Sequence, residues 1–119
     1  MSDFRFKDLT IWKDSIEIMD QLFEFSNRIK DQRYYRFAEQ LCAAALSISN
    51  NIAEGSGSSS DKEFSNFLNI SRRSVYECAN MTFIFERYKF ISTAEREEID
   101  ERLRKLGAMI ISFKNSLKK

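Results

Sequence analysis

Histidine and proline are absent from this sequence of 119 residues, and glycine occurs only at positions 55, 57 and 107. Without histidine, the chain lacks the commonest general base near neutral pH and the commonest zinc ligand. Its few glycines match neither a phosphate-binding loop nor a dinucleotide fingerprint. We therefore expect a protein that is not an enzyme, with no catalytic residue, no bound metal and no cofactor.

Long apolar runs and an excess of charge are missing as well. No run approaches the roughly eighteen apolar residues of a membrane span, and no apolar segment with a small-residue cleavage site follows the first residues. We expect no membrane contact and a cytoplasmic location. Lysines and arginines number 19 against 18 acids, so no large electrostatic field attracts a polyanion.

Cys42 and Cys78 are expected to be small core residues, with a disulfide or redox pair as the alternative.

The scarcity of proline and glycine also disfavours a β-sheet, because these residues form its turns. Apolar residues instead recur at steps of three and four, which is the spacing of one helical face. In the first segment, 8–29, Asp8 is the expected N-cap. The stripe that should face the core of this segment consists of Leu9, Trp12, Ile16, Met19, Leu22, Phe23 and Ile29.

Three further helical segments follow, each with a boundary signal. The second, 34–54, meets Gly55 and Gly57, either of which can end a helix in the left-handed conformation. Residues 60–63 and 92–95 each have the spacing of a capping box and predict the starts of the third and fourth helices. The fourth helix carries a heptad seam formed by Ile99, Leu103, Leu106, Ile110, Phe113 and Leu117.

These signals together predict the fold class. Four helices of roughly twenty residues, joined by short connections, pack with successive helices antiparallel. The sequence therefore predicts an all-α protein in which residues 1–119 form a single domain, an antiparallel up-down-up-down four-helix bundle.

A second apolar line on the first helix, Ile11, Ile18 and Phe25, recurs at steps of seven. One bundle core cannot bury both lines, and a large exposed apolar patch is uncommon on a monomer. We expect this line to contact another subunit, so the protein should be a homo-oligomer. The alternative is that loops or the Phe4-Arg5-Phe6 arm cover it.

Near the end of the second segment, the densest polar cluster places four side chains on one helical face: Ser47, Asn50, Asn51 and Glu54. Such a face can contact a partner or another subunit, and enzyme chemistry on Asn51 and Glu54 is the least expected use. The competing interpretation is structural, because short polar side chains bond helix carbonyls or pair with a neighbouring helix.

Charges are sorted along the fourth helix, with acids in its first turns and cations after them. The helix dipole favours this order by itself, and we place that interpretation first. The second interpretation is a phosphate-binding surface, whose contacts with nucleic acid would be Arg102, Arg104, Lys105, Lys118 and Lys119.

Short motifs are spread over nearly the whole chain: Phe6-Lys7-Asp8-Leu9 with Trp12, Gln40-Leu41, Ser47-Ile48, Asn51-Ile52-Ala53-Glu54-Gly55, and Lys62-Glu63-Phe64 with Phe67-Leu68. Together they resemble the four-helix-bundle family encoded by intervening sequences of bacterial 23S ribosomal RNA genes. The resemblance implies a bundle that assembles as a homopentamer, in a family with no established enzyme and an unsettled role. A related branch serves as accessory subunits of reverse transcriptases in diversity-generating retroelements and binds nucleic acid through a basic surface.

This chain departs from the family pattern at several positions. Cys42, Ala43 and Ser58 stand where the family often has arginine, so nucleic-acid binding should be weak at most. Ser49 replaces the usual proline. Lys89 stands where a helix-ending glycine is common, which predicts a left-handed lysine or an altered turn. The expected function is thus a non-enzymatic assembly or partner-binding module, with a nucleic-acid-binding accessory protein as the alternative.

Overall fold

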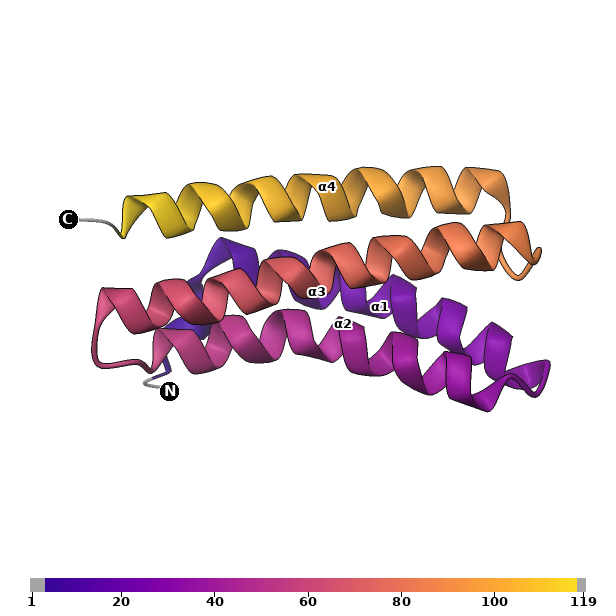
Figure 1. The fold of residues 1–119 in the computed structure, drawn as a ribbon, viewed down its shortest axis with the longest axis horizontal. Coiled ribbons are helices and arrows are strands. Elements are labelled where there is room, and N and C mark those ends of the chain that lie inside the picture. Colours follow the sequence, from indigo (N-terminus) through magenta and orange to yellow (C-terminus); the bar gives the residue numbers. More distant parts are fainter. Residues whose placement is uncertain (1–3, 118–119) are drawn as a thin grey trace.

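The computed structural model describes residues 4–117, which form four long helices after a short 3-10 helix. The elements are η1 (Arg5–Asp8), α1 (Thr10–Asp31), α2 (Tyr35–Ser56), α3 (Asp61–Arg87) and α4 (Thr93–Ser116). Successive helices run antiparallel in an elongated bundle that measures 46 × 26 × 22 Å (Figure 1). The predicted all-α four-helix bundle is confirmed.

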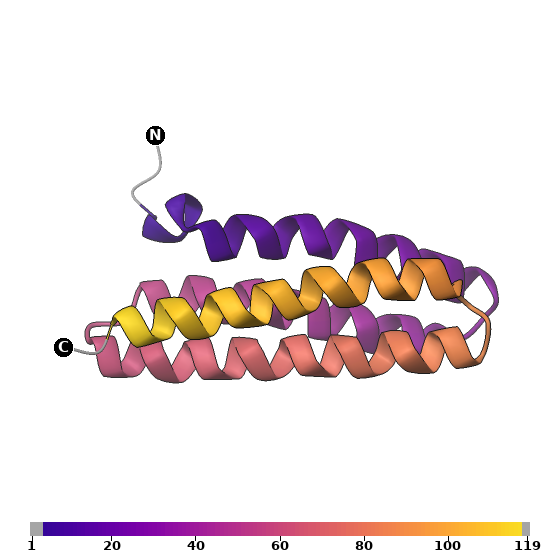
Figure 2. The ribbon, with the colours of Figure 1, turned by 90° about the horizontal axis from the view of Figure 1, so that it is seen from above.

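The helices do not pack equally against one another. α2 packs extensively against α1 and α3, whereas α4 rests mainly on α3 and meets α1 over a smaller area. Seen from above, α4 runs over the bundle between α1 and α3 (Figure 2). Of the predicted α4 seam, Ile99, Leu103, Leu106 and Ile110 are fully buried, while Phe113 and Leu117 are partly buried. None of the helices within residues 4–117 is long and apolar enough to cross a bilayer.

The second apolar line of α1 and part of its predicted core stripe have exchanged the places expected for them, whereas Leu22 and Ile29 of that stripe are fully buried as predicted. Ile11, Ile18 and Phe25 are only 4%, 3% and 1% exposed and belong to the core of the chain itself. Their predicted place on an outer, subunit-contacting line is therefore wrong. The outer line consists instead of the partly buried Trp12, Ile16, Met19 and Phe23.

A buried serine explains the exchange. The buried positions of α1 are Ile11, Ser15, Ile18, Leu22, Phe25, Ser26 and Ile29, which contain an unbroken heptad seam from 11 to 29. Ser15 occupies one seam position and satisfies its hydroxyl locally by donating to the Trp12 carbonyl at 2.7 Å. Because this serine interrupts the apolar pattern of the seam, the sequence favoured the neighbouring apolar line as the stripe that faces the core.

Helix ends follow the predicted signals only in part. Asp8 does not cap α1, because η1 ends at Asp8 and Leu9 takes the N-cap position without a side-chain bond. At α4 the predicted capping box is complete: Ser92 accepts from the Glu95 N–H at 3.1 Å, and Glu95 accepts from the Ser92 N–H at 2.9 Å. At α3 the Ser60 hydroxyl accepts from the Glu63 N–H, but the Glu63 carboxylate accepts from the Ser59 N–H instead.

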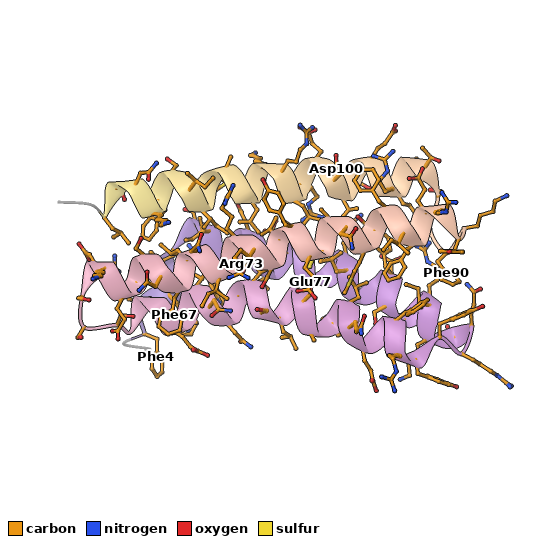
Figure 3. All side chains as sticks on the ribbon, in the orientation of Figure 1. Phe4, Phe67, Arg73, Glu77, Phe90 and Asp100 are labelled. Carbon is orange, nitrogen blue, oxygen red and sulfur yellow. The ribbon has the colours of Figure 1, made fainter. Side chains whose placement is uncertain are left out.

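Gly55 has a packing role and does not end α2. Neither Gly55 nor Gly57 is left-handed, and α2 continues to Ser56. A Cβ on Gly55 would lie 2.6 Å from Cδ1 of Phe64 and 2.8 Å from Cβ of Phe67. Phe67 lies where α3 passes the end of α2 (Figure 3). The missing side chain therefore lets the start of α3 approach the α2 backbone.

The turns after α1 and α3 share one backbone design, the Schellman motif. After α1, Arg33 donates to the Lys30 carbonyl and Tyr34 to the Ile29 carbonyl; after α3, Lys89 donates to Glu86 and Phe90 to Phe85. Arg33 (φ 70°) and Lys89 (φ 65°) take the left-handed position where glycine is least strained. The left-handed lysine predicted at position 89 is confirmed, and Arg33 repeats it.

Replacing Gly55 by alanine should lower the free energy of unfolding by roughly 1–3 kcal/mol, because the new methyl group overlaps the fixed Cβ of Phe67. Gly107→Ala is the matched control: its Cβ would lie 3.7 Å from Val75 Cγ1, an ordinary contact. That variant should gain about 0.5–1 kcal/mol from helix propensity. Urea denaturation followed by circular dichroism compares the two, and equal stabilities would disprove the close approach at Gly55.

Arg33→Gly and Lys89→Gly should each raise the free energy of unfolding by up to about 1 kcal/mol, because a side chain in the left-handed conformation is strained. Arg36→Gly, inside the first turn of α2, should lower it by about 1 kcal/mol. Thermal and urea denaturation measure both effects. A loss of stability in the two turn variants would show that the left-handed residues are not strained.

Candidate functional site

The structure splits the polar cluster predicted on α2. The Asn51 Nδ2 donates to the carbonyl and hydroxyl of Ser47 at 2.8 and 3.0 Å, and the Ser74 hydroxyl of α3 donates to the Ser47 hydroxyl at 2.7 Å. Ser47 therefore joins α2 to α3, and Asn51 bonds to Ser47 within α2, which is the structural interpretation. Asn50 and Glu54 face solvent.

Two other serine hydroxyls also form hydrogen bonds between neighbouring helices. The Ser71 hydroxyl on α3 donates to the Ile48 carbonyl of α2 at 2.7 Å, and the Ser26 hydroxyl on α1 donates to the Ala38 carbonyl of α2 at 3.0 Å. Both serines are buried. Sequence reasoning missed this role, although serine at a seam position was the available signal.

The two cysteines are free thiols. Cys42 Sγ donates to the Ser26 hydroxyl at 3.1 Å beside the α1–α2 contact. Cys78 is buried on α3, and this burial raises the pKa of its thiol to about 12, so it stays protonated. Both positions agree with the expected role as small packing residues. Within residues 4–117 no three acids or cysteines gather closely enough to hold a metal ion.

The cations predicted to contact nucleic acid from α4 are accompanied by partners. Arg102 Nη1 donates to Gln21 Oε1 at 2.6 Å. Arg104 pairs with Glu101 at 3.0 Å and with Asp100 at 3.6 Å on its own helix. Lys105 is exposed beside a small hollow that Asp14 and Glu17 of α1 also line. Lys118 and Lys119 lie outside the described residues. This arrangement favours the structural interpretation of the α4 charges.

One ion pair joins the end of α1 to the start of α4. The Arg28 guanidinium donates to both Glu95 oxygens, at 2.9 and 2.7 Å, in a bidentate pair. Glu95 is also the capping-box acid of α4. The Arg28 hydrogen bonds and the Ser92 backbone N–H lower the pKa of Glu95 to about 2. The pair spans 67 positions of sequence, so no local pattern indicates it.

An incompletely covered apolar surface lies where α1 and α2 meet. Its α1 part is the outer line, which starts at Trp12. The ring of Phe6 packs against Trp12 at 5.1 Å between centroids, and Phe4 packs on Phe6 at 5.8 Å, so the η1 arm covers this start. On α2 the surface includes Leu46, one turn after Cys42 and 40% exposed. We call the uncovered part, Ile16, Met19, Phe23 and Leu46, the α1–α2 edge.

A second apolar surface is a groove of about 520 Å³ between α3 and α4. Gly107 and Ala108 contribute little side-chain volume to it, and Leu103 and Ile111 line it. The Arg72 guanidinium at its border lies 5.2 Å from the ring centroid of Tyr76. Most of the lining is apolar, and the polar side chains of the groove are Arg72, Tyr76, Asp100 and Arg104.

Glu95→Gln should reduce stability by up to about 1 kcal/mol at neutral pH, since it removes a solvent-screened ion pair. The folded-state pKa of Glu95, about 2, lies below the ordinary value of 4.5. The stabilisation is therefore present above pH 4.5 and is lost as the pH falls toward 2. Urea denaturation at a series of pH values should show wild type and variant converging in acid. Glu97→Gln, exposed in the same turn, is the control; a constant difference across the series would contradict the assignment.

Comparisons with known proteins agree with the motifs and the fold. The chain is similar to a crystal structure of a protein with unknown function from the S23 ribosomal protein family of Bacteroides thetaiotaomicron VPI-5482. The TM-score is 0.82 at 21% identity, over 92% of this chain and 100% of that chain. No curated protein matches. The model of the 23S rRNA-intervening sequence protein family matches residues 7–112, from η1 to α4, and the chain therefore belongs to this family.

Proposed function

We propose that this protein is a non-enzymatic, self-associating module of the cytoplasm that works as an assembly or partner-binding unit. The observation that carries the proposal is the α1–α2 edge. Met19 and Phe23 pack against the core, Ile16 is partly buried, and Leu46 is 40% exposed, so the edge leaves apolar area in contact with water. Burying this area against another copy would be favourable, at about 25 cal/mol for each Å² removed from water.

The edge fits a contact between copies better than a ligand pocket. It is formed by side chains on the outer surfaces of two neighbouring antiparallel helices, so its neighbours would be other helices. The buried Ser26 and the partly buried Cys42 link α1 to α2 beside it, which keeps the two halves of the edge in register. Cyclic symmetry would cover the edge in every copy with one repeated contact.

The size of the assembly comes from the family. Five copies is the number that the family resemblance implies, and a ring of five is the assembly we expect. The other predicted contacts, Asn50 and Glu54, are exposed on α2 and are available to the same neighbour or to a different partner.

Light scattering on the purified protein tests self-association, with an expected mass five times 14.0 kDa. Leu46→Glu should dissociate the assembly while circular dichroism remains helical, because Leu46 is 40% exposed and a charge there stays hydrated in the monomer. A monomer mass for wild type at micromolar concentration would contradict the proposal, whereas another oligomer size would contradict only the number five.

Two controls separate dissociation from unfolding. Ile18→Glu places a charge at a position that is 3% exposed, so this variant should lose helical structure. Asn80→Glu adds the same charge to an exposed position on α3 and should leave both mass and helicity unchanged. If Asn80→Glu dissociates the protein as Leu46→Glu does, the contact does not lie at the α1–α2 edge.

A further inference from the structure

The end of the bundle that carries the two Schellman turns differs chemically from the rest of the surface. We call it the turn cap; it comprises Lys30, Arg33, Tyr34, Tyr35, Arg36, Phe37, Arg87, Tyr88, Lys89 and Phe90. Both turns lie at the same end of the molecule (Figure 1), and Phe90 marks this end in Figure 3. The rings of Tyr34 and Phe90, which follow the two left-handed residues, meet at 5.0 Å between centroids. The two turns therefore form one continuous surface.

Cations dominate this surface although the whole chain is nearly neutral. Five cap residues are exposed cations: Lys30, Arg33, Arg36, Arg87 and Lys89. Within residues 4–117 none of the five forms an ion pair. The cations that do form ion pairs there are Arg28, Arg96 and Arg104.

The acids near the cap offset these cations only in part. Glu86 is held by Arg96 at 2.8 Å, and the hydrogen bonds from Thr93 and Arg96 lower its pKa. Glu95 is held by Arg28. Asp31 and Glu39 are exposed near the α1–α2 turn, and Glu97 and Glu98 are exposed in the first turns of α4. Four exposed acids without an ion pair therefore stand against five exposed cations without one at this end, which leaves a small excess of positive charge that favours anions.

Aromatic rings are exposed among these cations. Tyr34, Tyr35 and Tyr88 are 49%, 55% and 62% exposed. Tyr34 is stacked on Phe37 at 5.7 Å with an interplanar angle of 13°, and Phe37 packs against the buried Phe85. Tyr34 is thus held by neighbouring rings, while Tyr35 and Tyr88 are the more exposed rings of the cap.

Two of these cations occupy strained backbone positions. Arg33 and Lys89 are the two non-glycine residues with positive φ in the described chain, and they occupy equivalent positions of the two turns. Glycine would relieve the strain at each position, yet both hold an exposed, unpaired cation. Strain that packing does not require is typical of positions with a function.

We propose that the turn cap binds single-stranded nucleic acid, with its five cations contacting phosphates and its exposed tyrosines stacking on bases. Unpaired cations interleaved with exposed rings are the pattern of single-strand binding surfaces. A duplex would use the cations but not the rings, because its bases are already stacked. An acidic protein segment would pair with the cations but would offer no planar bases on which the tyrosine rings could stack. This binding does not require self-association.

Fluorescence anisotropy with a labelled oligouridine tests the proposal at several salt concentrations. Binding in the micromolar range and a steep salt dependence are expected. The double variant Arg33→Gly with Lys89→Gly should reduce the slope of log K against log salt by about 1.4, since each lost phosphate contact on a single strand contributes about 0.7. The same variant should be more stable than wild type, so weaker binding cannot result from unfolding.

Matched variants locate the surface. Tyr88→Ala should weaken binding roughly fivefold or more, the loss of one base stack. Tyr76→Ala, 64% exposed on α3 outside the cap, should leave it unchanged. Arg104→Gln, which removes a paired cation from α4, should also have no effect.

Four results would overturn the proposal. The first is no binding of oligouridine at physiological salt. The second is equal weakening by the cap variants and by Tyr76→Ala or Arg104→Gln, which would place the site elsewhere. The third is equal affinity for a duplex of the same length, which would remove the role of the rings. The fourth is equally tight binding of polyglutamate, which would indicate an acidic protein partner.

Discussion

The close packing of α3 against α2 is the constraint on which the rest of the structure depends. α2 has the most extensive contacts, with α1 on one side and α3 on the other, and its last turns can approach α3 closely because Gly55 has no side chain. Buried serines reinforce the approach: Ser71 donates to an α2 carbonyl and Ser74 to the Ser47 hydroxyl. Small residues at this interface bring the helices together, and the hydroxyls of Ser71 and Ser74 each donate to an α2 acceptor. α1 and α4 then complete a core whose central pair is already positioned.

The sequence predicted the fold well where one signal acted locally. Apolar periodicity identified all four helices, and the α4 seam and its capping box lie as expected because nothing in that helix interrupts the pattern. The prediction failed where a small residue took an apolar position. Ser15 concealed the α1 seam, and Gly55 resembled a helix end although it serves a contact with residues of the next helix.

The candidate surfaces were harder to predict because they arise from residues far apart in the chain. The α1–α2 edge combines residues of two helices, and the bidentate bond of Arg28 with Glu95 joins helices that are not consecutive. The turn cap was missed for a different reason. Its cations are scattered among tyrosines in two turns, so neither turn contains a run of basic residues. The cations on α4, by contrast, form an obvious cluster in the sequence, but Arg104 there is paired with neighbouring acids.

The location of both turns at one end has a consequence for any assembly. If copies form a ring with their helices parallel to its axis, every turn cap lies on the same rim. A flexible strand held by one cap then remains within reach of the next, so each further contact is intramolecular. Sites that are individually weak would act together through their effective concentration. Such a rim would retain long strands and release short ones, and thereby select nucleic acid by length.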